Sequence, residues 1–431
     1  MKKVKYAGKM AASTPRPLVH PGKRWYTEPY ILGRRPVMLA IVTDVHYRMS
    51  LALIRDLGQA GVRVVTCEKE CCRRSRSSPA LGAFSRYTAR HVWLPDEEYL
   101  DAIYDLCRRE GMESGCKPAL MPVGAATLAL LAADRARFDE VCGLCIPTAA
   151  QLDLFNSKQQ VAALAGSLSV PVPVCFTRRE GEEDAAFVRR LPLPVVVKPV
   201  CGEKLGLSAA ERYAVAHTAA QAAEAIGHFR ALGGEEPIVQ QYLTGAGLGC
   251  SVLAQGGEVL SAICHRRVRE YPVSGGPSSC CRWEDRPALR QIAQDMVRAT
   301  GYTGLAMFEF KEDAEGTPRL LEVNPRIWGT FPLTRVSRSG MPLLWCTLAW
   351  NAGNPTLAVP LPQPQPQRGG KMIFVASDLM AARGYLRQGR PGRALGAVAD
   401  LINPFVRDGL FEWTDCAPAL VYYRALFGRG K

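Results

Sequence analysis

The pattern of apolar residues at the start of the chain predicts a parallel α/β unit. RPVMLAIVTD reads as a buried strand, the next apolar residues are spaced as in a helix that ends at Gly61, and VRVVTCEKE reads as a second strand. A strand, a helix and a strand in this order predict parallel strands with a right-handed crossover. Helices near 98–110 and 126–140, and short strands near 91–94, 119–122 and 144–147, extend the unit.

The rest of the chain mixes hairpins with helices. LPLPVVVKPV and PIVQQYLTG read as strands that flank the helix AAQAAEAIGHFRALG. Two hairpins are expected at 249–268, turning at Gly256-Gly257, and at 304–325, with a helix over 287–300 between them. After the Pro/Gln-rich linker VPLPQPQPQRGG we expect a short strand, a helix after Ser377-Asp378 and a second helical stretch rich in Tyr and Leu.

Composition places the chain among globular proteins. Its 431 residues are 48% hydrophobic, enough for two or three domains, and no apolar run approaches the roughly 18 residues of a membrane-spanning helix. The basic N-terminus has no apolar core, so we expect no secretory signal. The fifteen cysteines are scattered, and the lone CxxC from Cys142 to Cys145 is a weak metal or redox signal. Free thiols in a reducing cytoplasm are the expectation.

The positive charge lies at the two ends of the chain. Residues 1–35 carry +8 and residues 368–431 carry +5 of the total of +14, which leaves about +1 for residues 36–367. A specific nucleic-acid site would place a basic stripe on the folded body, so none is expected. Two basic ends are typical of solvated tails and, less often, of segments that contact an anionic surface.

Carboxylates gather in the second predicted hairpin. In LLEVNPR, Glu322 and Asn324 stand two residues apart and therefore share a strand face. With 314–317 as the turn, Glu309 in MFEFK pairs with Glu322, and all three side chains point the same way. Two such carboxylates raise each other's pKa unless a cation lies between them. Because hard oxygen ligands suit Mg²⁺, we predict that Glu309, Glu322 and Asn324 bind magnesium; a solvated sheet face is the alternative.

MFEFK followed by LLEVNPR resembles the metal-binding strands of the ATP-grasp superfamily, and the resemblance covers roughly residues 36–355. It implies a lysine in NSKQQ and one in VVVKP that contact the nucleotide, and a hinge in IVQQYLTG that pairs with the adenine edge. The loop CGEKLGLS is poorer in glycine than the family's phosphate-covering loop, so we expect either that a lysine there compensates or that the loop is looser. The implied nucleotide-binding residues are Lys158, Lys198, Lys204, Gln240, Gln241, Tyr242 and Leu243.

A narrower resemblance, to a bacterial group described as carboxylate–amine ligase-like, rests on the stretch HRRVREYPVSGGPSS. The implied fold is α/β, a Rossmann-like N-terminal domain followed by an ATP-grasp fold with a small lid and a larger α+β domain. The expected division is a basic tail over 1–35, the Rossmann-like domain over 36–155, the ATP-grasp domain over 156–355 with its lid at about 172–243, and a linker with a basic C-terminal extension over 356–431.

Several cationic side chains are candidates for contact with substrate. Arg326 follows the metal strand and could reach a transferring phosphoryl group. His265, Arg267 and Arg269 alternate along one strand, and arginine forks bind carboxylates well, so an anionic partner outside the chain is expected. A solvated basic strand edge is the alternative.

Polar residues also follow the first strand of the N-terminal unit. Ligands of open α/β sheets bind beyond strand carboxyl ends, so His46, Arg48 and Ser50 are candidate substrate contacts, with helix capping as the alternative. Ser85-Arg86 is a weaker candidate of the same kind.

The resemblance implies an ATP- and Mg²⁺-dependent ligase that joins a small carboxylate to an amine, or to a thiol, through an acyl phosphate. Such chemistry needs positioning and charge neutralisation more than a covalent nucleophile. The alternatives are a carboxylase or carbamoyl-phosphate-type enzyme and a nucleotide-binding module without catalysis. A cytoplasmic protein with small-molecule partners is expected, and a homodimer is left open.

Overall fold

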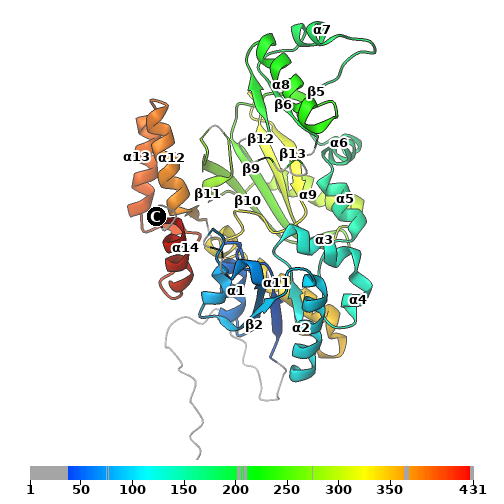
Figure 1. Cartoon of the computed structure of the whole chain (residues 1–431), viewed down its shortest axis with the longest axis vertical. Coiled ribbons are helices and arrows are strands. Elements are labelled where there is room, and N and C mark those ends of the chain that lie inside the picture. The colour runs from blue at the N-terminus through cyan, green and yellow to red at the C-terminus, as the bar shows by residue number, and fades with distance from the viewer. Residues whose placement is uncertain are drawn as a thin grey trace, which may run out of the picture. The chain divides into compact units, whose positions relative to one another are not determined.

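The computed structural model describes residues 37–427 except 74, 76, 201–204, 206, 208–210, 274, 364–366 and 368. Lys204 and most of the phosphate-covering loop therefore lie outside the described residues. The described residues form three sheets with helices packed on them (Figure 1). None of the described helices combines the length and the apolar character that a membrane crossing requires.

The N-terminal sheet is parallel, with strand order β3-β2-β1-β4, as the apolar pattern predicts. All four residues of β1 are buried, which explains its continuous apolar run. The strands are β1 (Leu39–Val42), β2 (Arg63–Lys69), β3 (Thr88–Leu94) and β4 (Ala119–Met121), with helices α1 (Ser50–Gln59), α2 (Tyr99–Ser114), α3 (Ala125–Ala133) and α4 (Arg135–Asp139) and short 3₁₀ turns η1 (Glu70–Cys72) and η2 (Leu81–Phe84).

Two predictions for this sheet are wrong. The helix expected over 126–140 is broken at Asp134, whose backbone leaves helical geometry between α3 and α4. The strand expected over 144–147 is not one, because only Gly143 bridges to Ala119 before the chain reaches Pro147. A proline has no N–H for a strand ladder, which favours this early departure.

A helix from far along the chain completes the N-terminal core. α11 (Met341–Gly353) is buried from Met341 to Trp350 and packs on α1, β1 and β4. The indole N–H of Trp345 donates to the carbonyl oxygen of Cys145 at 2.7 Å, so its one polar atom is satisfied. η3 (Pro355–Leu357) follows α11.

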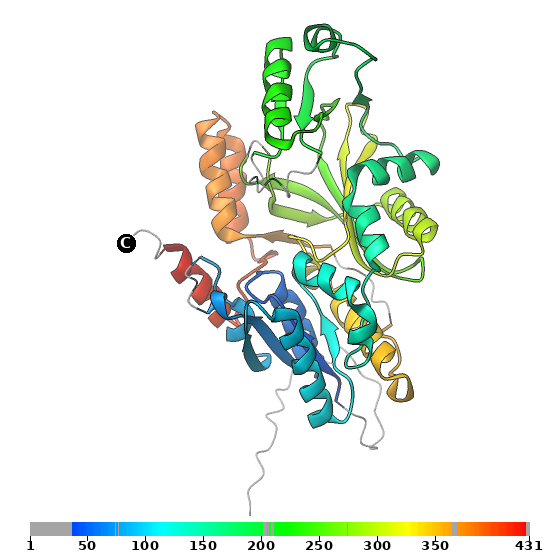
Figure 2. The same cartoon turned by 45° about the vertical axis from the view of Figure 1, so that its right-hand side comes forward.

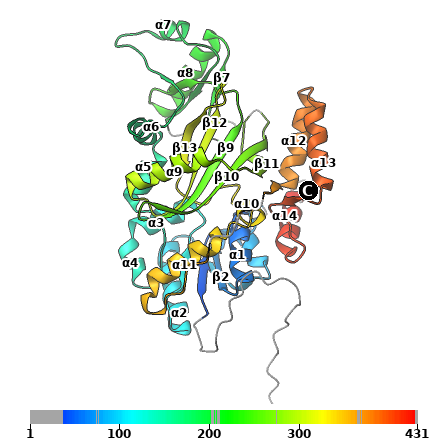
Figure 3. The same ribbon diagram turned by 180° about the vertical axis from the view of Figure 1, so that it is seen from behind.

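The largest sheet has seven strands in the order β13-β12-β9-β10-β11-β14-β15. α9 (Pro287–Thr300) packs on β9 and β10, as seen from behind in Figure 3, and buries Leu289, Ala293, Met296 and Val297. Both predicted hairpins are present, and β11, for which no strand was predicted, pairs with β10. The strands are β9 (Gly247–Gln255), β10 (Glu258–Glu270), β11 (Ser278–Trp283), β12 (Gly304–Glu312), β13 (Pro318–Asn324), β14 (Lys371–Ile373) and β15 (Val406–Asp408), accompanied by α5 (Ala149–Asn156), α6 (Lys158–Ser167) and α10 (Leu333–Val336).

A third, four-stranded sheet has its own hydrophobic core. Its strand order is β5-β8-β6-β7, and all of its pairings are antiparallel. α8 packs on β6 and β7 and buries Ala222, Ile226 and Phe229 against Val195 and Val197 (Figure 2). The elements are β5 (Cys175–Phe176), α7 (Asp184–Arg189), β6 (Val195–Lys198), β7 (Ala214–Ala216), α8 (Ala219–Gly233) and β8 (Ile238–Gln241).

The C-terminal extension adds strands β14 and β15 and three helices, α12 (Val375–Arg387), α13 (Pro391–Ile402) and α14 (Ala417–Phe427). α12 and α13 lie side by side as an antiparallel pair (Figure 1). The sequence predicted only two helical stretches here, so α13 and β15 were missed. Pro391 and Gly392 at the start of α13 are residue types that usually indicate a loop, although proline is well suited to the first turn of a helix.

Buried ion pairs attach the extension to the body. The guanidinium of Arg269 on β10 donates to Asp378 of α12 at 2.9 and 2.7 Å and to Asp400 of α13 at 2.6 Å. Arg269 is only 6% exposed, and both carboxylates are buried. Arg55 on α1 pairs in the same way with Asp415 at 2.8 Å. Because charges this deeply buried depend on their partners, these contacts fix the extension in place.

We predict that Arg269→Met lowers the free energy of unfolding by about 3–5 kcal/mol, because it leaves Asp378 and Asp400 buried without their shared cation. Arg282→Met is the matched control: it removes an exposed arginine that pairs with Glu284, and it should cost less than about 1 kcal/mol. Urea unfolding of both variants checks this. Equal losses in the two variants would contradict the anchoring role of Arg269.

Candidate active site

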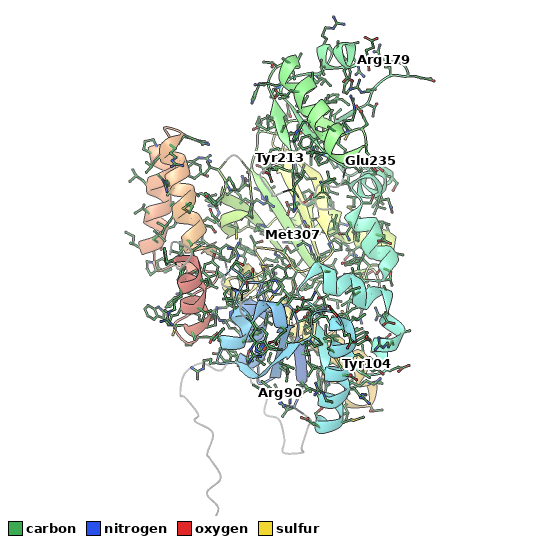
Figure 4. The ribbon with its side chains drawn as sticks, in the orientation of Figure 1. Arg90, Tyr104, Arg179, Tyr213, Glu235 and Met307 are labelled. Atoms are coloured by element: carbon green, nitrogen blue, oxygen red, sulfur yellow. The ribbon has the colours of Figure 1, made fainter. Side chains whose placement is uncertain are left out.

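The predicted carboxylate cluster forms, but through a different hairpin register. A turn at 314–317 would place residue 311 opposite residue 320, whereas Lys311 in fact pairs with Arg319. Leu321 is an extra residue on β13, a β-bulge that shifts the pairing by one. Beyond the bulge Glu309 pairs with Glu322, and Met307, labelled in Figure 4, pairs with Asn324. The opposition of the two glutamates is therefore confirmed.

The surroundings of Glu309 compensate its charge in part. Arg267 donates to one carboxylate oxygen at 2.5 Å, and the amide of Asn324 donates to the other at 3.2 Å. Burial raises the pKa of Glu309 above its ordinary value, and the Glu322 charge adds to the rise, while Arg267 and Arg326 oppose it. Two carboxylates and an amide oxygen from one hairpin are a donor set that fits a hard divalent cation.

Two lysines from different elements approach the same carboxylates. Lys158 begins α6, after the Ser157 hydroxyl that caps the helix, and its Nζ lies 3.7 Å from Glu322 Oε2. Lys198 ends β6 in the small sheet. Burial lowers the pKa of Lys198 to about 8, the charge of Lys158 lowers it further, and the charge of Glu322 opposes the shift. The predicted Lys158 and Lys198 therefore come together beside Glu322.

The predicted hinge lies at the end of β8. Gln240 and Leu243 are buried, and the backbone N–H of Gln241 donates to the carbonyl oxygen of Val174 at 2.8 Å. Lys311 places its Nζ 5.6 Å from the ring centre of Tyr242. Burial lowers the pKa of this lysine from its ordinary value. Sequence reasoning missed Lys311, although it follows Glu309 by two residues on one strand face.

Small residues on β9 let the side chains of β10 reach this cluster. Gly249 pairs with Glu309 on one side and with His265 on the other, so the three residues form a row across the sheet. A Cβ atom at Gly249 would lie 2.3 Å from the ring of His265, and one at Gly247 would lie 2.9 Å from Arg267 Cδ. Only glycine therefore leaves room for both side chains to lie over β9.

The three predicted groups of the arginine strand divide between two places. Arg267 reaches Glu309, as described above. His265 is buried, 3.5 Å from the Thr330 hydroxyl, and burial lowers its pKa to about 3, so its imidazole is neutral near pH 7. Arg326 donates to the carbonyl oxygen of Ile327 at 3.2 Å and lies near enough to Glu309 to lower its pKa.

Arg269 is not brought to the site. Its partners Asp378 and Asp400 belong to the chain itself, so the expectation of an external anion for this residue is wrong. The physical reason is a second irregularity: Arg267 pairs with Cys281 but Arg269 pairs with Cys280, which leaves Val268 as an extra residue. Strict alternation, on which the prediction relied, fails across such a bulge.

Most of the N-terminal candidates have other partners. The guanidinium of Arg48 stacks on Phe374, 3.5 Å from its ring centre, and the Ser50 hydroxyl donates to the carbonyl oxygen of Tyr47 at 2.8 Å at the start of α1. Ser85 and Arg86 both bond to Asp415 and so help to dock the extension. These contacts agree with the structural alternative to substrate binding.

His46 remains at the carboxyl edge of the N-terminal sheet. Its Nδ1 lies 2.7 Å from Glu68 Oε2, and Cys72 completes a set of ligand atoms within 4.8 Å of one another. The hydrogen bond between His46 and Glu68 accounts for this pair without a metal. The charge of Arg326 acts on the pKa of the neighbouring Tyr47, a residue that sequence reasoning missed. This edge of the sheet therefore lies next to the carboxylate cluster.

Comparison with solved structures agrees with the fold described above. The biotin carboxylase of Campylobacter jejuni, solved as a β,γ-ATP complex, superposes with a TM-score of 0.55 at 16% identity, over 77% of this chain and 74% of that one. The biotin carboxylase domain of Hydrogenobacter thermophilus 2-oxoglutarate carboxylase, solved with MgADP and bicarbonate, gives 0.54 at 14% identity, over 77% and 73%. At these identities the likeness concerns the fold alone.

One family model matches part of the chain, and it is an ATP-grasp model, which agrees with the sequence resemblance. More narrowly, residues 234–366 match the family described as "ATP-grasp in the biosynthetic pathway with Ter operon". No curated protein sequence matches the chain. Assignment to the carboxylate–amine ligase-like group stays a prediction.

We predict that Lys198 titrates near pH 8 rather than at its ordinary 10.5. NMR of the ¹³C-methylated lysines measures this, and Lys198→Arg identifies the resonance. Lys158→Met should raise the pKa of Lys198, because a like charge disappears, and Glu322→Gln should lower it further. A pKa of Lys198 that stays at 10.5 or ignores both substitutions would contradict the clustering of the three side chains.

Proposed function

We propose that this protein is an ATP-dependent ligase that activates a small carboxylate as its acyl phosphate and transfers the acyl group to an amine. The observation that carries the proposal is the opposed pair Glu309 and Glu322, with Asn324 beside them. Four cationic side chains surround this pair: Lys158, Lys198, Arg267 and Arg326. A carboxylate anion is a poor electrophile, so this reaction needs charge neutralisation, which such a cluster supplies.

The donor set fits magnesium. Glu309, Glu322 and Asn324 would hold the ion, with Glu309 released from part of its contact with Arg267 and Asn324 turned to present its oxygen. Bound Mg²⁺ would neutralise charge on the nucleotide phosphates. In the absence of an ion Arg267, Lys158 and Asn324 stabilise the carboxylates instead, which accounts for the contacts seen here.

The nucleotide would lie between the small sheet and the large one. Lys158 and Lys198 would contact phosphate oxygens, and the backbone of Gln240 to Leu243 would pair with the adenine edge. Lys198 would bind phosphate in its protonated form. Since its pKa is about 8 in the free protein, nucleotide affinity should fall as the pH rises through this value.

The substrate carboxylate would bind beside Arg267 and Arg326. Arginine offers a planar fork to a carboxylate and to the phosphoryl group that it receives. A carboxylate oxygen attacks the γ-phosphorus of ATP, ADP leaves, and the amine then displaces inorganic phosphate from the acyl carbon with loss of a proton. His265 is neutral and would orient rather than neutralise.

A carboxylase is the second candidate, because biotin carboxylases share the fold, and bicarbonate could bind the same cationic side chains as a carboxylate. A nucleotide-binding module without catalysis is the third, suggested by the glycine-poor loop. The three differ in what stimulates ATP cleavage: a carboxylate with an amine, bicarbonate, or nothing.

Hydroxylamine trapping tests the proposal directly. The protein is incubated with ATP, Mg²⁺ and panels of amino acids and other small carboxylates, and ADP and hydroxamate are measured together. Stoichiometric hydroxamate with one carboxylate class supports an acyl phosphate. ADP release that depends on bicarbonate alone supports the carboxylase, and ATP binding without cleavage under every condition supports the third candidate.

We predict that Glu322→Gln reduces Mg²⁺-dependent ADP formation by at least about a hundredfold while the fold is retained, because the ion loses a charged ligand. Glu315→Gln, in the exposed turn of the same hairpin, is the matched control and should leave the rate unchanged. Full activity of the first variant at ordinary magnesium would remove Glu322 from the metal site.

We predict that Arg267→Lys reduces carboxylate-dependent ADP formation by about tenfold or more with little change in ATP affinity, since it keeps the charge and loses the fork. Arg266→Lys is the control, because Arg266 is paired with Glu284 and Glu312. A variant that instead needs more magnesium at normal carboxylate dependence would make Arg267 a positioning residue for Glu309.

A further inference from the structure

The outer face of α13 is apolar and uncovered. Leu395, Val398 and Ile402 stand at helical spacing on one side of the helix and are 69%, 49% and 82% exposed. Phe405, three residues beyond the helix, is 83% exposed. Single exposed apolar residues are ordinary on a protein surface, but a stripe of aliphatic side chains along one helix is typical of a binding face.

The exposed charges on the stretch of chain that carries this stripe, from Leu379 to Arg407, are all positive. Between Leu379 and Arg407 the chain carries one acidic residue, Asp400, which is buried and bonded to Arg269 and Lys371. The same stretch carries five arginines, all exposed: Arg383, Arg387, Arg390, Arg393 and Arg407. A surface with aliphatic and cationic groups and no exposed carboxylate of its own is complementary to an anionic, partly apolar partner.

We propose that the α12–α13 pair binds the surface of an anionic phospholipid bilayer. Helices that lie in the bilayer interface bury an aliphatic stripe among the acyl chains while arginines contact the phosphates around it. Leu395, Val398 and Ile402 would enter the membrane, with Phe405 at its boundary. The inference is independent of the proposed ligase reaction.

The internal packing of the pair supports this use. α12 and α13 pack against each other through one buried cluster. It consists of Ala381, Ala382 and Tyr385 on α12 and of Ala394 and Ala397 on α13. The ion pairs of Arg269 with Asp378 and Asp400 fix these inner faces, so the outer face is presented without rearrangement. Exposed positions can therefore be substituted with little effect on folding.

Two other occupants agree less well with the charges. In a symmetric contact with a second copy, each arginine cluster would face an identical cluster, and like charges would oppose association. Nucleic acid would pair with the arginines but would leave the aliphatic stripe exposed. A bilayer that contains anionic lipid satisfies both the charges and the stripe.

Vesicle flotation of the full chain tests the proposal. Vesicles of phosphatidylcholine alone are compared with vesicles that also contain phosphatidylglycerol, at low and high salt. We expect binding to the anionic vesicles, weaker at high salt, and at least about a tenfold loss of binding in the double variant Leu395→Glu/Ile402→Glu. Met112→Glu, at a position on α2 that is 73% exposed, is the matched control and should bind normally.

Each other outcome has a definite meaning. Vesicle binding that survives Leu395→Glu/Ile402→Glu but fails at high salt would assign the binding to positive charge alone, such as that of residues 1–35, and would overturn the proposal that the aliphatic stripe enters the bilayer. Absence of vesicle binding, with a dimer in light scattering that the double variant dissociates, would assign the face to a second copy. Leu395→Ser/Ile402→Ser, which adds no charge, repeats the test if the glutamate variant fails to fold.

Discussion

The opposition of Glu309 and Glu322 across two antiparallel strands is the constraint on which the candidate site depends. Directly paired residues hold their side chains a few ångströms apart, and two carboxylates at that distance cannot both ionise at little cost without compensation. Burial raises the pKa of Glu309, and the charge of Glu322 adds to the rise. Compensation comes from outside the hairpin, through Arg267 next to Glu309 and Lys158 next to Glu322. The hairpin brings the negative charges together, and cationic side chains from the surrounding elements compensate them.

The compensating positive charges come from segments that are far apart in the sequence. Lys158 begins a helix, Lys198 ends a strand of the small sheet, and Arg267 extends over a glycine from the second neighbouring strand. Each alone is an ordinary cation. Burial lowers the pKa of Lys198 to about 8, and the charge of the neighbouring Lys158 lowers it further, while the charge of Glu322 opposes the shift. A polyanionic ligand would reverse this balance and favour the charged form of Lys198.

Sequence reasoning works here where the local rule is regular. Continuous apolar runs give the parallel N-terminal sheet, and alternation along β12 and β13 gives the shared face of Glu322 and Asn324. It fails where the signal is a tertiary contact. Ser85, Arg86 and Arg48 stand at a sheet edge where ligands bind in related folds, but Asp415 and Phe374 reach them from the C-terminal extension. No local pattern shows that a segment some 330 residues later returns to this edge.

The two β-bulges show how a single extra residue decides which partners a side chain reaches. The turn of this hairpin differs in length from the expected one, and the bulge at Leu321 offsets the difference. Glu309 therefore still pairs with Glu322, although the expected register was wrong. At Val268 the bulge has the opposite effect and separates two arginines that alternation would place together. Arg267 faces the carboxylate cluster, whereas Arg269 enters a buried ion-pair network with the extension. One strand thus serves the site with one half and anchors the C-terminal helices with the other. A charge-changing substitution on either side of Val268 therefore acts on a different set of contacts, the carboxylate cluster at Arg267 and the docking of the extension at Arg269.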